Sequence, residues 1–241
     1  MKITRILKGA GIRSNFGTMG ASAVTLIEDE SSILVDTGHY GNRNNLKESL
    51  SVAEKDVSDI DIVVLTHLNW DHCLNLELFE NAKIVIGKKE LEEGTLSGSD
   101  DKFTEKFREF LATRDLLLIE ELKRISRHST IIPTPGHTAG HISVRVDFNN
   151  SLTVISGDAI PNLRAYRRGI PDYIFFDLEL ARNSVEKIRG MRPNTIIPGH
   201  DSPFNDNGYL QNDVIEFILR NENEENTVIT YRKSEADYPL R

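Results

Sequence analysis

The segment Thr66–His72 places two histidines, an aspartate and an asparagine directly after the apolar run Ile62–Leu65. Where a chain leaves a strand, side chains that are close in sequence can converge on one point. Neutral imidazole and carboxylate groups are ligands that zinc, iron and manganese accept. The segment therefore predicts a metal site, and Asn69 stands where a third strong ligand is expected.

Three further apolar runs end in the same way, each in a glycine-containing turn that carries histidine or aspartate. These turns supply His137 after Ile131–Ile132, Asp158 after Leu152–Ile155, and His200 after Ile196–Ile197. A single histidine at a strand end is a common coincidence. Ligand-type residues at four strand ends favour one shared site.

Composition limits the classes of protein that the chain can be. Its 241 residues, 39% hydrophobic and 27% charged, fit one globular domain over residues 1–241. No apolar run approaches the roughly 18 residues of a membrane span, and the N-terminus does not read as a signal peptide. We therefore expect a cytoplasmic protein.

Charge and cysteine content narrow the partners further. The net charge of −8 disfavours nucleic acid as a partner. Cys73 is the one cysteine, which excludes an internal disulfide and a cysteine-rich zinc ribbon. A metal must then be held by histidine, aspartate and asparagine.

The elements that position these residues alternate between strands and helices. Hydrophobic periodicity predicts strands at Ile3–Leu7, Ala23–Ile27, Ser32–Val35, Ile62–Leu65, Ala82–Gly87, Ile142–Phe148, Leu152–Ser156 and Val228–Tyr231. It predicts helices at Asn42–Glu54, from Lys88, at Leu178–Arg189 and at Val214–Leu219, with a helical insertion over about 101–128. Gly17 and Gly20 mark the turn between the first two strands, and Leu180, Val185 and Ile188 are expected to face the core. The alternation predicts sheets with helices laid on them.

On these motifs the chain resembles the metallo-β-lactamase superfamily along essentially its whole length. The family pattern His-x-His-x-Asp-His matches His67, Asp71 and His72, with Asn69 in place of the second histidine. Further matches are Asp36–Gly38, Pro135–Thr138, Gly157–Asp158 and Pro198–His200. The resemblance implies an α/β fold, the four-layer αββα sandwich, with metals at one edge between two sheets.

Within the superfamily, the chain looks like the acyl-homoserine-lactone lactonases. This likeness rests on Gly157–Ala159, Phe176–Ala181 and Gly199–Asp201. Those lactonases carry a tyrosine three residues after the bridging aspartate, where this chain has Pro161. Tyr166 and Tyr173 are the two alternatives for its role.

The resemblance also implies a ligand set for one or two ions. One metal would take His67, Asn69 and His137, and the other Asp71, His72 and His200, with Asp158 between them. Zinc is the expected metal, and iron or manganese are alternatives. A metal-bound hydroxide would be the nucleophile, and Asp71 or Asp158 would pass a proton to the leaving group.

Asn69 leaves three outcomes open, because an amide oxygen is a weaker zinc ligand than an imidazole. The first metal could bind more weakly, the site could keep only the second metal, or catalysis could be lost.

The leading functional prediction is a hydrolase acting on a small-molecule lactone or other carboxylic ester. A phosphodiester or nucleotide hydrolase is the alternative, served by Arg164, Arg167 and Arg168. A degenerate member that binds metal or ligand without turnover is a third option. A homodimer is one option for its assembly.

The remaining candidates near the motifs have more modest expected roles. His141 is expected to support a ligand or its loop, His39 is a substitute ligand for Asn69, and His128 belongs to the surface. Trp70, Cys73 and Asp36 are expected to be structural, and Asp201 could be structural or functional. Trp70 with Phe103, Phe107 and Phe110 could line an acyl pocket or belong to the core.

Overall fold

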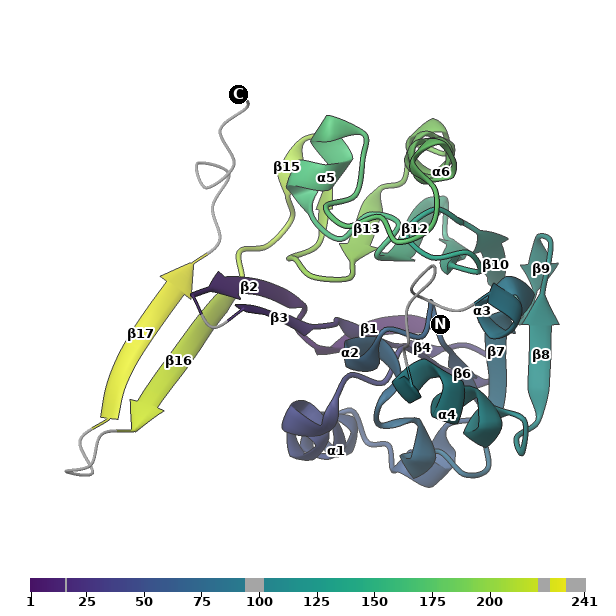
Figure 1. The fold of residues 1–241 in the computed structure, drawn as a ribbon, viewed down its shortest axis with the longest axis horizontal. Helices are drawn as coiled ribbons and strands as arrows, with labels where there is room; N and C mark the ends of the chain where they lie inside the picture. The colour runs from purple at the N-terminus through teal and green to yellow at the C-terminus, as the bar shows by residue number, and fades with distance from the viewer. Residues whose placement is uncertain (16, 94–101, 221–225, 233–241) are drawn as a thin grey trace.

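Two β-sheets lie face to face in the computed structural model, which describes residues 1–15, 17–93, 102–220 and 226–232 (Figure 1). The first sheet contains, in spatial order, β1 (Lys2–Leu7), β4 (Val24–Glu28), β5 (Ser32–Val35), β6 (Ile62–Val64), β7 (Lys83–Gly87) and β8 (Leu116–Ile119). The second contains β15 (Gly208–Tyr209), β14 (Phe204–Asn205), β13 (Thr195–Pro198), β12 (Ser151–Gly157), β11 (Ile142–Phe148), β10 (Ser129–Pro133) and β9 (Lys123–Arg124).

Six α-helices and two hairpins complete the described elements. The helices are α1 (Arg43–Val52), α2 (Trp70–Cys73), α3 (Lys88–Glu93), α4 (Lys102–Leu111), α5 (Leu163–Arg168) and α6 (Leu178–Gly190). The hairpins are β2 (Ala10–Ser14) with β3 (Gly17–Ala21), and β16 (Val214–Arg220) with β17 (Asn226–Arg232). Three short 3₁₀ turns lie at Tyr40–Asn42, Val57–Asp59 and Leu76–Leu78.

Strand alternation sorts the apolar residues into three cores, because successive side chains point to opposite faces of a sheet. In β5, Ile33 and Val35 pack between the two sheets, whereas Leu34 packs outward against α1 and α4. On the second sheet, Val154 and Ile196 pack outward against α5 and α6. Helices thus cover the outer face of each sheet (Figure 1), which confirms the predicted αββα sandwich.

Parallel strand pairs fix where the loops emerge. β5, β6, β7 and β8 are parallel neighbours in the first sheet, and β12 and β13 are parallel in the second. Their carboxyl ends therefore open at one edge of the sandwich. Among the described residues, no helix is long and apolar enough to span a lipid bilayer.

The predicted helical insertion over about 101–128 is wrong in its second half. Lys102–Leu111 is helical as expected, but Leu116–Ile119 forms β8 and pairs with β7. The backbone of this run forms hydrogen bonds with β7 at the edge of the first sheet. This long-range pairing overrides the local helical pattern. Residue 101 lies outside the described residues.

The helix predicted at Val214–Leu219 is also wrong, because this segment is strand β16. It pairs with β17 from Val214↔Arg232 to Arg220↔Asn226, so the predicted strand Val228–Tyr231 is confirmed. Its content of Val, Ile and Phe suits a strand better than a helix.

Two finer predictions also require correction. Gly17 and Gly20 lie within β3 of an additional hairpin and do not form a simple turn between the first two strands. In α6, Val185 and Ile188 are buried as expected, whereas Leu180 is 37% exposed and Ala181 takes the inward position.

Candidate metal centre

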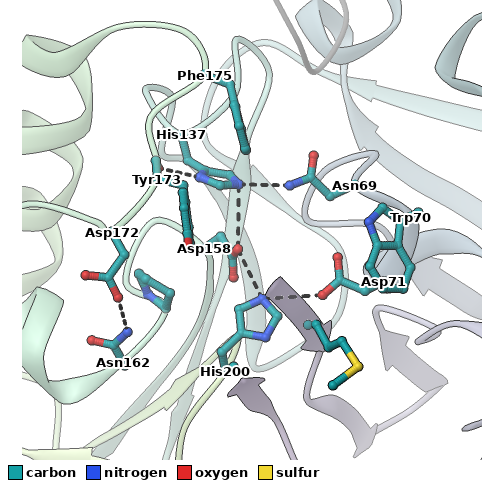
Figure 2. Close-up of a pocket in the computed structure, with 14 residues that line it drawn as sticks. Asn69, Trp70, Asp71, His137, Asp158, Asn162, Asp172, Tyr173, Phe175 and His200 are labelled. Atoms are coloured by element: carbon teal, nitrogen blue, oxygen red, sulfur yellow. Dashed lines mark hydrogen bonds and ion pairs between the residues drawn. The ribbon is translucent and has the colours of Figure 1, made fainter. Parts of the chain in front are cut away.

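The predicted ligand residues all follow strands that end at the shared edge of the sandwich. The segment after β6 supplies His67, Asn69, Asp71 and His72; the turns after β10, β12 and β13 supply His137, Asp158 and His200. Figure 2 shows Asn69, Asp71, His137, Asp158 and His200 pointing toward one another from both sheets.

A first group consists of His67, His137 and Asp158, whose candidate ligand atoms lie within 4.8 Å of one another. Asn69 joins it, because its side-chain Nδ2 lies 3.2 Å from His137 Nε2. Rotation of the amide would present its Oδ1 in the same place. The four residues therefore surround one point from the two sheets.

A second group consists of Asp71, His72 and His200, whose candidate ligand atoms also lie within 4.8 Å of one another. The Nε2 atoms of His72 and His200 are 3.4 Å apart, and His200 Nε2 is 3.5 Å from Asp71 Oδ2. Asp71 and His72 both belong to α2, so one short helix presents two ligand-type groups.

Asp158 lies between the two groups. Its Oδ2 is 3.6 Å from His137 Nε2 and 3.2 Å from His200 Nε2, and its Oδ1 is 3.6 Å from His72 Nε2. A carboxylate within reach of both groups has the geometry of a bridging ligand.

Each of the four histidines has its Nδ1 atom occupied on the outer side of the centre. The partners are Thr66 Oγ1 for His67 (3.0 Å), Asp36 Oδ2 for His72 (2.8 Å), Tyr173 O for His137 (2.8 Å) and Ala21 O for His200 (3.2 Å). A ring that donates from Nδ1 keeps the lone pair of Nε2 for a metal. This arrangement orients all four Nε2 atoms inward.

Among the buried side-chain atoms of the described residues that lack a hydrogen-bond partner, two belong to the candidate ligands. They are His67 Nε2 and Asp158 Oδ1. Leaving such atoms unsatisfied in the interior costs about 1–3 kcal/mol each. A divalent cation would satisfy both, so the donor set fits a metal ion.

The charges of the centre also fit a cation. Burial alone would lower the pKa of His72, but Asp36, Asp158 and Asp71 raise it to about 10. Burial and the neighbouring imidazoles hold the pKa of His67 well below its usual value. The centre thus combines a neutral imidazole with a surplus of carboxylate charge, which attracts positive charge.

Asp36 and His141 support the centre from outside, as expected. Asp36 accepts from the Thr66 backbone N–H (2.8 Å) as well as contacting His72. His141 Nε2 accepts from the backbone N–H groups of Asp158 (3.0 Å) and Ala159 (3.2 Å), which fixes the turn that carries the bridging carboxylate.

Other expected candidates lie outside the centre. His39 packs on Trp70 and its Nδ1 accepts from Gly41 N–H, so it is not grouped with the ligand residues. His128 is half-buried and its Nδ1 lies 2.9 Å from Asp29 Oδ1, which corrects its assignment to the surface. Asp201 accepts from Leu163, Ser202 and Tyr209 and is structural.

Sequence reasoning missed Glu90, which is fully buried beside the centre. Burial raises its pKa to about 7. It sits in the run Lys88–Glu93, where five of six residues are charged, and such a run reads as a solvated helix face. No local signal distinguishes this glutamate from its exposed neighbours.

A pocket of about 260 Å³ opens over the centre. Its lining includes Asn69, Asp71, His137, Asp158 and His200, together with the apolar surfaces of Met19, Trp70, Pro161, Tyr173 and Phe175. Trp70 lies on one side and Tyr173 and Phe175 on the other (Figure 2). None of the described lining residues is lysine or arginine.

The phenylalanines and arginines singled out in the sequence lie elsewhere. Phe107 and Phe110 of α4 are partly buried and pack against the outer core of the first sheet, whereas Phe103 is exposed and stacks on Phe107. Arg168 contacts Asp172 (3.0 Å), and none of the three arginines lines the pocket.

A model of the metallo-beta-lactamase superfamily matches residues 17–200, which include all the candidate ligands. The chain belongs to the metallo-β-lactamase superfamily. It is 34% identical over 170 residues to a probable metallo-hydrolase of Methanocaldococcus jannaschii, covering 70% of each chain. The protein is therefore a metallo-hydrolase of this superfamily.

Other superfamily members with a named substrate class are more distant. The chain is 26% identical to an N-acyl homoserine lactonase of Bacillus cereus, over 59% of this chain and 56% of that one. An AiiA variant from Bacillus thuringiensis, solved with N-decanoyl-L-homoserine at its active site, superposes with a TM-score of 0.66 at 20% identity, covering 83% of this chain and 92% of that chain. At this identity the superposition supports the shared superfamily fold.

Proposed function

We propose that this metallo-hydrolase acts on a small neutral carboxylic ester, with lactones as the leading substrate class. The observation that carries the proposal is the lining of the pocket. Beside the candidate metal centre its walls are mostly apolar apart from Asn162 and Asp172, and its described residues include no lysine or arginine. A neutral acyl group suits such walls, whereas a phosphate would call for lysine or arginine. The lactonase relatives support the same class.

We assign His67, Asn69 and His137 to one metal ion and Asp71, His72 and His200 to a second, with Asp158 bridging. Zinc is the leading metal because imidazole and carboxylate dominate the donor set, and iron or manganese are alternatives. Two such ions, when bound, lower the pKa of water to about 7 and polarise a carbonyl oxygen.

The residues of the chain supply positioning and proton transfer. Asp71 lines the pocket, so its carboxylate can carry a proton to the leaving oxygen. Tyr173 also lines the pocket, whereas the Tyr166 hydroxyl donates to Asp206 away from it. Tyr173 is therefore our candidate for the role that lactonases give to the tyrosine replaced here by Pro161.

The two alternative functions have less support. Phosphodiester hydrolysis lacks a phosphate contact in the pocket, because Arg164, Arg167 and Arg168 lie outside its lining. A degenerate binder without turnover does not explain why four histidines and two aspartates converge on one centre. The homodimer and the cytoplasmic location stay predictions.

The test compares three substrates on the full chain reconstituted with zinc. We expect kcat/KM for a lactone and an aryl ester to exceed that for bis-p-nitrophenyl phosphate by roughly a hundredfold or more. Asp71→Asn should lower kcat by about 10²–10⁴-fold, because it removes the proton carrier.

Arg164→Ala is the matched control, since Arg164 is exposed and outside the pocket. It should leave all three rates unchanged. Faster phosphodiester than ester hydrolysis, or a loss of phosphodiester hydrolysis in the Arg164 variant, would replace this proposal with the nucleotide alternative.

A further inference from the structure

Glu90 is an ionisable residue in the interior, with 0% of its surface exposed. The rest of α3 is largely polar and faces solvent; Glu92, two residues away, is exposed. A carboxylate is rarely buried unless several hydrogen bonds compensate for lost hydration. Its contacts should therefore indicate why it is inside.

The two oxygens of Glu90 hold two different loops. Oε1 accepts from the backbone N–H of Leu68 (3.1 Å), and Oε2 accepts from Thr138 Oγ1 (2.8 Å) and from the backbone N–H of Gly140 (2.9 Å). Leu68 lies between His67 and Asn69, and Thr138 directly follows His137. One carboxylate thus joins the ligand loop of the first sheet to that of the second.

The main chain around Glu90 is equally constrained. A Cβ atom on Gly140 would lie 2.1 Å from the Glu90 backbone nitrogen. Only glycine at this position therefore allows the loop that carries His137 to pack this closely against α3. On the other side, Nε and Nη2 of Arg108, from α4, donate to the Glu90 carbonyl oxygen at 3.2 and 2.8 Å. Glu90 cannot shift without moving one of the two loops.

We propose that Glu90 is a positioning residue that sets the separation of the loops carrying His67, Asn69 and His137, and thereby the affinity of the first metal site. The inference rests on the proposed metal centre. It predicts an unequal effect, because neither loop contact of Glu90 involves Asp71, His72 or His200. A general loss of stability would instead weaken both sites.

The test is a cobalt(II) titration of the metal-free full chain and of Glu90→Gln, followed by visible absorption. The substitution keeps the size of the side chain but points an NH₂ group at Thr138 and Gly140, or at Leu68 if it is rotated. We expect cobalt binding at the first site to weaken about 10–100-fold. Binding at the second site should stay within about twofold of wild type. His137→Ala and His72→Ala identify which spectral step belongs to which site.

Glu92→Gln is the matched control on the same helix and should titrate like wild type. If Glu90→Gln does not fold, Thr138→Val removes one of the three hydrogen bonds and should weaken the first site alone by a smaller factor. Unchanged cobalt affinity in either variant, or equal weakening at both sites together with a lower unfolding free energy, overturns the role of Glu90. A wild-type chain that binds no cobalt overturns the metal centre itself.

Discussion

Asn69 is the residue at which the sequence resemblance predicts a departure from the superfamily pattern, and its surroundings indicate what it does. It occupies the N-cap position of α2, where asparagine commonly bonds to the backbone, yet its side chain makes no capping bond. The amide faces His137 instead. The side chain is therefore directed at the proposed first metal site, where its oxygen would be a neutral and weak ligand.

Replacing Asn69 with histidine should restore a strong ligand at this position. We expect Asn69→His to tighten metal binding at the first site by roughly tenfold or more, because imidazole is a better zinc donor than an amide oxygen. Competition with a chromogenic chelator measures the change. His39→Asn is the control, since His39 packs on Trp70. An unchanged affinity in Asn69→His would mean that position 69 does not face the ion.

Among the elements, the strands that precede the candidate ligands were predictable from the sequence. The strand pairs β7–β8 and β16–β17 were not. Asn149 and Asn150 have φ values of 50° and 60°, so they form a left-handed turn between the predicted strands β11 and β12, a conformation that asparagine tolerates. In contrast, β8 and β16 were predicted as helices, because short apolar runs fit both the helical period and the strand period. The deciding contacts of β8 come from β7, about thirty residues earlier.

Asp29 connects the two sheets by hydrogen bonds at a place away from the candidate metal centre. Asp29, after β4 in the first sheet, accepts from Ser126 Oγ (2.8 Å) and from the backbone N–H of His128 (3.0 Å), in the turn before β10. Burial would raise the pKa of Asp29, but the hydrogen bonds from His128 and Ser126 lower it to about 2. The ionised carboxylate is thus the form that holds the turn.

Asp29→Asn should therefore destabilise the protein by about 1–2 kcal/mol at pH 7. A carboxyl whose pKa is lowered in the folded state stabilises it above the unfolded pKa, near 4. That contribution is lost as the pH falls toward 2. Urea unfolding at pH 7, 4 and 2 measures the difference, which should shrink toward the lowest pH. A difference that does not change with pH would show that the charge of Asp29 is irrelevant.

At the scale of the whole molecule, the sandwich brings together carboxylates that would repel one another without a cation. Asp36, Asp71 and Asp158 all lie within reach of His72, and all are buried. The two sheets meet at this edge, so an ion bound at the proposed centre would link the halves of the fold.

Removing the metal should therefore lower thermal stability as well as activity. Ligand at about 100 times its Kd contributes about 2.7 kcal/mol, which corresponds to a Tm change of roughly 5–10 °C for a chain of this size. Calorimetry before and after chelation, and after zinc is returned, measures it. His72→Ala with His137→Ala is the control and should show no zinc-dependent shift. An identical Tm for the chelated and zinc-loaded wild type would argue against a metal that joins the two sheets.

The sequence by itself determined the types and order of the candidate ligands and the architecture that carries them. Strand ends, glycine turns and the motif around His67 are local features, because a few consecutive residues decide each of them. The lactonase-like features and the departure at Asn69 were readable for the same reason.

Only the tertiary structure decided how the centre is supported. Glu90 contacts Leu68 and Thr138, which lie 22 and 48 positions away, and the carbonyl of Tyr173 orients His137 from 36 positions away. Contacts of this kind leave no periodic or compositional mark, because any residue brought there by the sheets could supply a backbone oxygen, and an aspartate or glutamate from any element could supply a carboxylate. The candidate ligands can therefore be read from the local sequence, whereas the geometry that orients them arises from the packing of the two sheets.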